Sequence, residues 1–209
     1  MDKKCSEIYN TLEKVIENPV CELEFNNPYE LLVAVILSAQ CTDKRVNMVT
    51  KDLFKKYGTV ESLANANIGD VENIIKPCGF YKNKARNIVN ACADIVNKYG
   101  GQVPNNKNEL LTLSGVGVKT ANVVLAEAYG VPTIAVDTHV LRVSNRLGIA
   151  KSKDVGQVET QLQNNFDKST WVKLHHMLIL FGRYYCKSRN PQCNDCVLSK
   201  YCDYYKEKK

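Results

Sequence analysis

Apolar residues recur at helical spacing along nearly the whole of this 209-residue chain. No segment alternates between apolar and polar residues over the length of a strand, except for 131–136, which Pro132 weakens because proline cannot donate to a sheet. The first helical stripe ends before Pro19 and is formed by Ile8, Leu12, Val15 and Ile16. This pattern predicts an all-α fold.

Capping residues and helix breakers divide the pattern into separate helices. Asn27 is a favoured N-cap and Pro28 a favoured first helical residue, so a helix starts there. Its apolar interior, 31–37, is rich enough in β-branched residues to be a buried strand, but the cap and the lack of a partner strand favour a helix buried on most sides. Further helices are expected at about 42–57, 68–76, 82–99, 106–112, 118–129, 137–147, 154–165 and 170–185.

The chain carries 28 basic and 22 acidic side chains, a net charge of +6. This excess permits a polyanionic partner but does not require one. No apolar stretch reaches the roughly 18 residues of a transmembrane helix, and the polar N-terminus shows no signal peptide. We expect a cytoplasmic protein that makes no membrane contact.

Two glycines flank one apolar residue just before an expected helix, at Gly115 and Gly117. Because glycine has no side chain, the backbone N–H groups of Gly115, Gly117 and Val118 can closely approach an anion such as a phosphodiester. Lys119 falls in the first turn of this helix, where the positive end of the helix dipole favours the uncharged amine that imine chemistry needs. The alternative is an ordinary solvated lysine on a helix face.

An aspartate opens another expected helix eighteen residues after this lysine, at Asp137. Aspartate is a favoured N-cap, so a purely structural cap is one interpretation. Beside an activated lysine, however, a carboxylate could also stabilise a cationic sugar or move protons. His139, two residues further on, is expected to line the same pocket.

Nine cysteines occur, and their odd number argues against a closed disulfide framework. Five are scattered among helical residues and are expected to be small buried hydrophobes: Cys5, Cys21, Cys41, Cys78 and Cys92. The other four lie within seventeen residues with the spacing C-x6-C-x2-C-x5-C, namely Cys186, Cys193, Cys196 and Cys202. Such a group predicts a metal site. Its single closely spaced pair favours an iron–sulfur cube over zinc, which usually takes two such pairs.

These segments resemble the endonuclease III family of DNA glycosylase/lyases. Residues 115–124 (GVGVKTANVV) are similar to its helix-hairpin-helix, and 132–140 (PTIAVDTHV) to its loop ending in the catalytic aspartate. The cysteine spacing matches that of its four-iron, four-sulfur cluster. Residues 37–40 (LSAQ) and 171–183 also fit, so the resemblance spans nearly the whole chain.

The resemblance implies two helical domains with the active site between them. A six-helix barrel domain would span 22–132 and contain the helix-hairpin-helix at about 108–129. A cluster domain would combine 1–21 with 133–209 and hold one [4Fe-4S] cluster in an iron–sulfur loop at 186–202.

The resemblance also implies an activity: removal of oxidised pyrimidines from duplex DNA, then strand cleavage 3′ to the abasic site by β-elimination through a lysine Schiff base. Lys119 would be the nucleophile and Asp137 its partner. Gln40 would fill the gap left by the extruded nucleotide, and Phe80 would wedge into the opposite strand, where the family often has leucine. We expect a nucleoid-associated monomer that acts on double-stranded DNA with damaged bases or abasic sites. DNA contacts are expected from His139 and, in the cysteine loop, from Lys187 and Arg189.

Two residues depart from the family pattern. Ser114 stands where a proline is common, and Val118 where a basic residue is common, which removes one phosphate contact. Two alternatives remain. A monofunctional glycosylase on the same scaffold would mostly lack lysine at the position of Lys119. A non-catalytic helix-hairpin-helix protein that only binds DNA would not need Asp137 or the cysteines.

Overall fold

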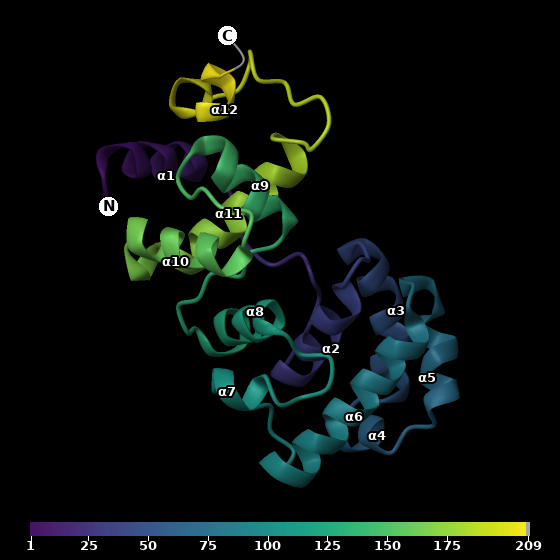
Figure 1. Ribbon diagram of the computed structural model, residues 1–209. Coiled ribbons are helices and arrows are strands. Elements are labelled where there is room, and N and C mark those ends of the chain that lie inside the picture. Colours follow the sequence, from purple (N-terminus) through teal and green to yellow (C-terminus); the bar gives the residue numbers. More distant parts are fainter. Residues whose placement is uncertain (208–209) are drawn as a thin grey trace. The chain divides into compact units, whose positions relative to one another are not determined.

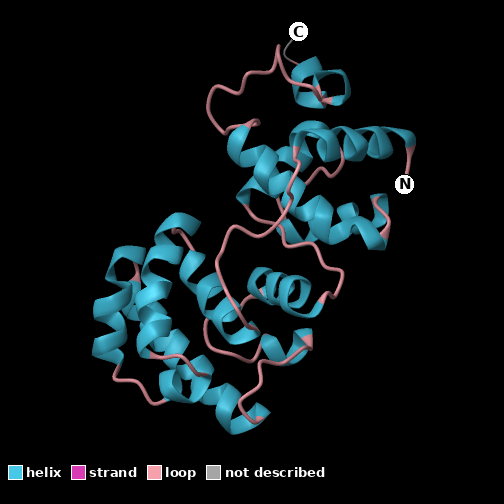
Figure 2. Ribbon diagram, turned by 180° about the vertical axis from the view of Figure 1, so that it is seen from behind, coloured by secondary structure: helices cyan, strands magenta, loops and turns pink. Residues whose placement is uncertain are grey.

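The computed structural model describes residues 1–207, in which every regular element is a helix (Figure 1, Figure 2). This range forms twelve α-helices and three 3-10 helices, and no strand occurs in it. The prediction of an all-α fold is therefore confirmed. The chain divides into two compact units. We call Cys21–Val131 the middle unit, and Met1–Val20 together with the described part of Pro132–Lys209 the terminal unit.

The middle unit is built around one helix that is buried on nearly all sides. Residues 29–37 of α2 are all buried, and α2 packs against α3, α6 and α8 (Figure 1). A helix that is apolar all round needs such neighbours on every side. The helices of this unit are α2 (Pro28–Ser38), α3 (Asp43–Lys56), α4 (Val60–Ala64), α5 (Ile68–Ile75), η1 (Lys76–Cys78), α6 (Tyr81–Tyr99), α7 (Lys107–Leu110) and α8 (Val118–Tyr129).

The start of α2 follows the expected capping chemistry. The Asn27 side chain accepts a hydrogen bond from Glu30 N, and Pro28 occupies the first turn. The five-residue helix α4, in contrast, has no counterpart among the expected helices. It is too short to show a periodic pattern, and a capping box between Thr59 and Ser62 starts it where it packs against α6.

The terminal unit joins both ends of the chain in one core. Cys5, Ile8 and Leu12 of the first helix are buried with Phe181 and its neighbours. The helices of this unit are α1 (Lys3–Val15), α9 (Thr138–Leu147), α10 (Val155–Asn165), η2 (Lys168–Thr170), α11 (Trp171–Tyr184), η3 (Ser199–Tyr201) and α12 (Asp203–Lys206).

A glycine sets the close packing of α9 against α11. A Cβ placed on Gly182 would lie 2.9 Å from the Cβ of His139 and 3.0 Å from Cγ2 of Val143. Real Cβ atoms do not approach this closely, so the two helix backbones can pack at this distance only with glycine at this point.

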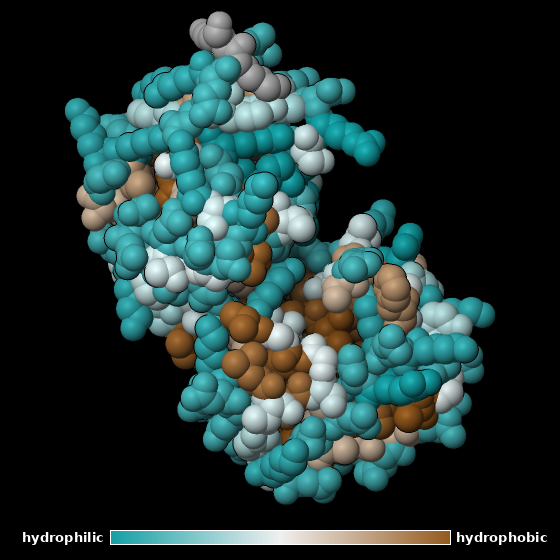
Figure 3. Space-filling model, viewed as in Figure 1, coloured by the Kyte–Doolittle hydropathy of each residue, from teal (hydrophilic) through white to brown (hydrophobic). Residues whose placement is uncertain are grey.

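Three of the five scattered cysteines are buried as expected, namely Cys5, Cys78 and Cys92, while Cys21 and Cys41 are half-buried. On the face seen in Figure 3, hydrophilic residues cover most of the surface, and hydrophobic residues show most over the middle unit. Within residues 1–207, no helix is long and apolar enough to cross a membrane.

Candidate active site and cysteine centre

The turn before α8 presents an open helix N-terminus. Gly115 has φ +76°, and a Cβ there would lie 2.8 Å from the Cβ of Asn87, so this glycine is required by the fold itself. Gly117 is the N-cap of α8 and supplies no capping side chain. The backbone N–H groups at the start of α8 therefore meet no side-chain cap, which leaves them available to an external anion.

Gly117 differs from Gly115 in what surrounds it. Its φ of −98° suits any residue, and a Cβ there would meet no atom of the protein within 4 Å. The protein thus leaves open space around Gly117, as a site for close approach of a ligand backbone needs. Lys119, one residue into the first turn of α8, has an exposed side chain beside this space.

Asp137 is the N-cap of α9, as the structural interpretation of this residue predicts. Its Oδ1 accepts hydrogen bonds from His139 N and Val140 N, each 2.8 Å long. The side chain is half-buried, and its Oδ2 lies outside these two bonds. The cap therefore fixes the orientation of the carboxylate and leaves one oxygen for other chemistry.

The imidazole of His139 contacts an arginine that sequence reasoning did not identify. Nδ1 of His139 lies 3.1 Å from Nη2 of Arg142, and the same Nη2 donates to Gly182 O at 2.7 Å. Arg142 Nε also donates to Cys186 O at 3.1 Å. Since an arginine always donates, Nδ1 acts as the acceptor and the ring proton is on Nε2.

The four clustered cysteines line a single cavity of about 240 Å³ within the terminal unit. A tight turn joins the closely spaced pair, with Cys196 N donating to Cys193 O at 3.3 Å. Burial raises the pKa of the Cys196 and Cys202 thiols, and the neighbouring thiols of the group add to the increase. Within residues 1–207, no three His, Cys, Asp or Glu side chains converge as ligands of one metal ion.

A second arginine, Arg146, organises the loop between the cysteines. Its Nη1 lies 3.3 Å from Cys186 Sγ and donates to Lys187 O at 2.8 Å, while Nη2 donates to Ser188 O at 3.1 Å. Its guanidinium also lies over the Tyr204 ring, 4.7 Å from the centroid. No local sequence pattern reveals this role, because the contacts join residues 40 or more positions apart.

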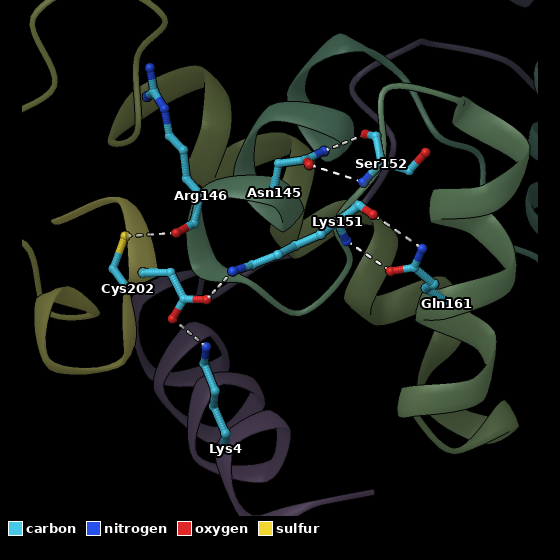
Figure 4. A network of polar contacts seen from close by, with 8 residues as sticks. Lys4, Asn145, Arg146, Lys151, Ser152, Gln161 and Cys202 are labelled. Atoms are coloured by element: carbon cyan, nitrogen blue, oxygen red, sulfur yellow. Dashed lines mark hydrogen bonds and ion pairs between the residues drawn. The ribbon is translucent and has the colours of Figure 1, made fainter. Parts of the chain in front are cut away.

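The segment that follows the last cysteine is anchored by polar contacts drawn in Figure 4. Cys202 Sγ donates to Arg146 O at 3.1 Å, and the Asp203 carboxylate lies 2.8 Å from the ammonium groups of both Lys4 and Lys151. These two lysines lower the pKa of Asp203. A Cβ on Gly148 would lie 1.9 Å from Asp203 Oδ2, so only glycine allows this approach. The contacts fix one wall of the cysteine cavity.

Gln40 and Phe80 share an unusual backbone conformation. Gln40 has φ +54° and Phe80 has φ +46°, in the left-handed region that favours glycine. Phe80 is also 67% exposed. Backbone strain of this kind clusters at functional sites, so both are candidates for ligand contact.

The structure brings the sequence-predicted residues together in three groups. Gly115, Gly117, Val118 and Lys119 share the start of α8; Asp137 and His139 share the start of α9; the four cysteines share the cavity, with Lys187 and Arg189 exposed in their loop. Lys119 belongs to the middle unit and Asp137 to the terminal unit. Their union in one catalytic site stays a prediction, as do the DNA contacts.

Comparison with known proteins places the chain among DNA repair enzymes. Residues 33–168 match the family described as HhH-GPD superfamily base excision DNA repair protein. The chain is 52% identical over 183 residues to the endonuclease III of Bacillus subtilis (strain 168), covering 87% of this chain and 84% of that protein. It is 44% identical over 202 residues to the endonuclease III of Escherichia coli (strain K12), covering 97% and 95%.

Solved structures agree with this placement. A structure described as a trapped endonuclease III–DNA covalent intermediate, an estranged-adenine complex, has a TM-score of 0.94 and 47% identity and covers 100% of this chain and 99% of its own. A thermostable thymine-DNA glycosylase has a TM-score of 0.87 at 25% identity, with 98% coverage of both chains. The chain therefore belongs to the endonuclease III family, within the HhH-GPD superfamily of base excision DNA repair proteins.

Proposed function

We propose that this protein is a bifunctional DNA glycosylase and AP lyase of base excision repair. It removes oxidised pyrimidines from duplex DNA and cleaves the strand 3′ to the resulting abasic site. One observation carries the proposal: an exposed lysine, Lys119, stands at the uncapped N-terminus of α8 beside the open space at Gly117. The endonuclease III that is 47% identical to this chain has been trapped as a covalent intermediate with DNA.

The first step is capture of the damaged strand. A base inside the stack hides its sugar carbon, so the nucleotide is flipped out at a cost of a few kcal/mol, which a poorly stacked damaged base reduces. The N–H groups at the start of α8 bind a neighbouring phosphate and so read the backbone without reading its sequence. Gln40 fills the gap left by the extruded nucleotide, and Phe80 wedges into the opposite strand.

The chemistry then depends on the amine of Lys119. Its nitrogen attacks the anomeric carbon of the sugar, the glycosidic C–N bond breaks, and the damaged base leaves. Opening of the sugar ring gives an imine, which makes the adjacent C2′ acidic. Loss of the C2′ proton breaks the C3′–O bond and expels the 3′ phosphate, which cleaves the strand.

Asp137 is the carboxylate partner of this amine. Two backbone N–H groups fix its Oδ1. This leaves Oδ2 to stabilise the cationic sugar or to accept a proton from Lys119. His139 lies beside it, held by Arg142, and is expected to line the same pocket.

The four cysteines fit a [4Fe-4S] cluster as their resident group. The donor set is four thiols around a cavity of about 240 Å³, far more room than a single zinc ion takes with sulfur ligands about 2.3 Å away. Arg146 adds an N–H donor to one thiol. Bound there, the cluster supplies cross-links that order the loop between Cys186 and Cys202, so that Lys187 and Arg189 can contact DNA phosphates.

Borohydride trapping tests the function. A duplex bearing thymine glycol or an abasic site is expected to become covalently linked to the protein, because borohydride reduces the Lys119 imine to a stable amine. Lys119→Gln should abolish trapping while binding of the duplex persists, and Lys55→Gln, at an exposed lysine of α3, should trap normally.

Other outcomes identify the alternatives. Base release without trapping would identify a monofunctional glycosylase, and binding without either reaction would identify a DNA-binding protein only. Trapping that persists in Lys119→Gln would assign the nucleophile elsewhere. For the cysteines, a brown protein with iron and sulfide is expected, whereas a colourless protein with stoichiometric zinc would overturn the cluster.

A further inference from the structure

A buried lysine on α6 has no part in the chemistry above. Lys84 is 5% exposed, and its Nζ donates hydrogen bonds to Leu37 O and Cys78 O, each 2.9 Å long. Burial lowers the pKa of Lys84, against the opposing effect of the Cys41 and Cys78 thiols. A buried ammonium is costly unless it is paired or hydrogen-bonded, so its two carbonyl partners explain how it is retained.

Both carbonyls belong to the ends of helices. Leu37 lies in the last turn of α2, and Cys78 is the last residue of η1. Carbonyls at helix C-termini lack partners within the helix and carry the negative end of its dipole. One ammonium therefore caps two helices from different parts of the sequence and joins their ends.

The residues just beyond these two helix ends are Gln40 and Phe80. After α2 the chain makes a four-residue turn, closed by Cys41 N donating to Ser38 O at 3.0 Å, with Gln40 as its third residue. Ala39 at φ −57° and ψ 113°, followed by Gln40 at φ +54°, corresponds to a type II turn, whose third position favours glycine. Phe80 follows Cys78 by two residues and precedes α6.

We propose that Lys84 is a positioning residue for the step that opens the duplex. Its ammonium holds the ends of α2 and η1 at a fixed separation, so that Gln40 and Phe80 are presented to the DNA as one unit. The inference rests on the proposed function, in which these two side chains enter the duplex. Lys84 would thus control how well the lesion is extruded without taking part in the chemistry itself.

The test compares two substrates that differ only in the need to open the duplex. The first is thymine glycol in an intact duplex. The second carries the same lesion opposite a one-nucleotide gap, where the opposite strand offers no nucleotide to displace. Lys84→Met removes the ammonium and keeps an unbranched apolar stem. Lys98→Met is the matched control, since Lys98 lies at the far end of the same helix and pairs with Asp94 on the surface.

Lys84→Met is expected to lower single-turnover base release from the intact duplex by on the order of 100-fold, as a misplacement of about 1 Å does. Release from the gapped duplex should stay close to that of the unmodified protein. Because both rates are measured on one preparation, a smaller folded fraction would lower them equally and leave their ratio unchanged. Lys98→Met should change neither rate.

A double-mutant comparison adds a second readout. If Lys84 acts through Phe80, then Lys84→Met on a Phe80→Ala background should cost little further activity on the intact duplex. Should Lys84→Met fail to fold, Lys84→Gln, which keeps two N–H donors on a shorter stem, is scored by the same ratio. Equal losses on both substrates, full additivity with Phe80→Ala, or unchanged activity on the intact duplex would each overturn the proposal. Failure of the proposed function would show separately, as an unmodified protein that releases no base.

Discussion

The two glycines before α8 differ in what their missing side chains make room for. Gly115 has a left-handed backbone and touches Asn87, whereas Gly117 has an ordinary backbone and open space around its Cα. The fold thus requires the first glycine, whereas no atom of the protein within 4 Å requires the second, which is consistent with the proposed phosphate contact. Both positions are glycine in the sequence motif, and only the structure shows that their surroundings differ.

We predict that alanine lowers stability at Gly115 and weakens DNA binding at Gly117. Gly115→Ala should lower the free energy of unfolding by about 1–3 kcal/mol, because it adds a clash to a left-handed backbone. Gly117→Ala should change stability by less than about 1 kcal/mol, yet weaken binding to a duplex with a tetrahydrofuran abasic analogue, because its methyl group meets the phosphate. Urea unfolding and fluorescence anisotropy measure the two quantities. Normal DNA binding by Gly117→Ala would argue against phosphate contact there.

Asp137 allows its capping role to be separated from its catalytic role. Asparagine caps helices as well as aspartate does, so Asp137→Asn should unfold like the unmodified protein. Its base release should nevertheless fall roughly 100-fold or more, because the carboxylate is lost. Asp137→Ala should lose the same activity and also about 1 kcal/mol of stability with the cap. Full activity in Asp137→Asn would reduce the residue to a structural cap.

At the scale of elements, sequence patterns predicted the longer helices well and failed where the element was short or the contact was distant. The buried helix α2 was predicted from its cap and apolar run, and the helix starting at Asp137 was predicted from its cap. The short helix α4 was missed because five residues show no period. Arg142 and Arg146 were missed because most of their partners lie 40 or more positions away, beyond any local pattern.

The cysteine spacing was the strongest predictor of a site, since all four thiols line one cavity. The backbone strain at Gln40 and Phe80 could not be predicted, because neither residue type favours a left-handed conformation. The role of Lys84 could not be predicted either, because its partners are backbone carbonyls, which every residue has.

The contact between α9 and α11 gives a prediction at this scale. Gly182→Ala should lower the free energy of unfolding by about 1–3 kcal/mol, because the added methyl group overlaps the side chains of His139 and Val143. Thermal or urea unfolding measures the loss. Gly156→Ala on α10 serves as the control. A Cβ at Gly156 would meet only Asp154 Oδ1, at 3.3 Å, so the free energy of unfolding of this variant should stay close to that of the unmodified protein.

For the whole molecule, the net charge of +6 predicts salt-dependent binding. Binding releases counterions from each phosphate that the protein neutralises. Affinity therefore falls with salt, and each phosphate contact steepens the slope of log affinity against log salt concentration by about 0.9. Lys187→Ala and Arg189→Ala should therefore each reduce this slope by about 1 if both side chains contact phosphate. Fluorescence anisotropy across a salt series measures it, with Lys14→Ala on α1 as the control. Unchanged slopes in both variants would place the cysteine loop away from the DNA.

The terminal unit has a consequence for how the chain matures during synthesis. Helix α1 buries Cys5, Ile8 and Leu12 in a core that also contains residues synthesised late, including Phe181 and Leu198. The intervening 111 residues, Cys21–Val131, form a core of their own. During synthesis the middle unit can therefore complete its core before the residues that pack against the apolar stripe of α1 have been made. The stripe of α1 therefore lacks part of its packing until residues such as Phe181 and Leu198 have been synthesised.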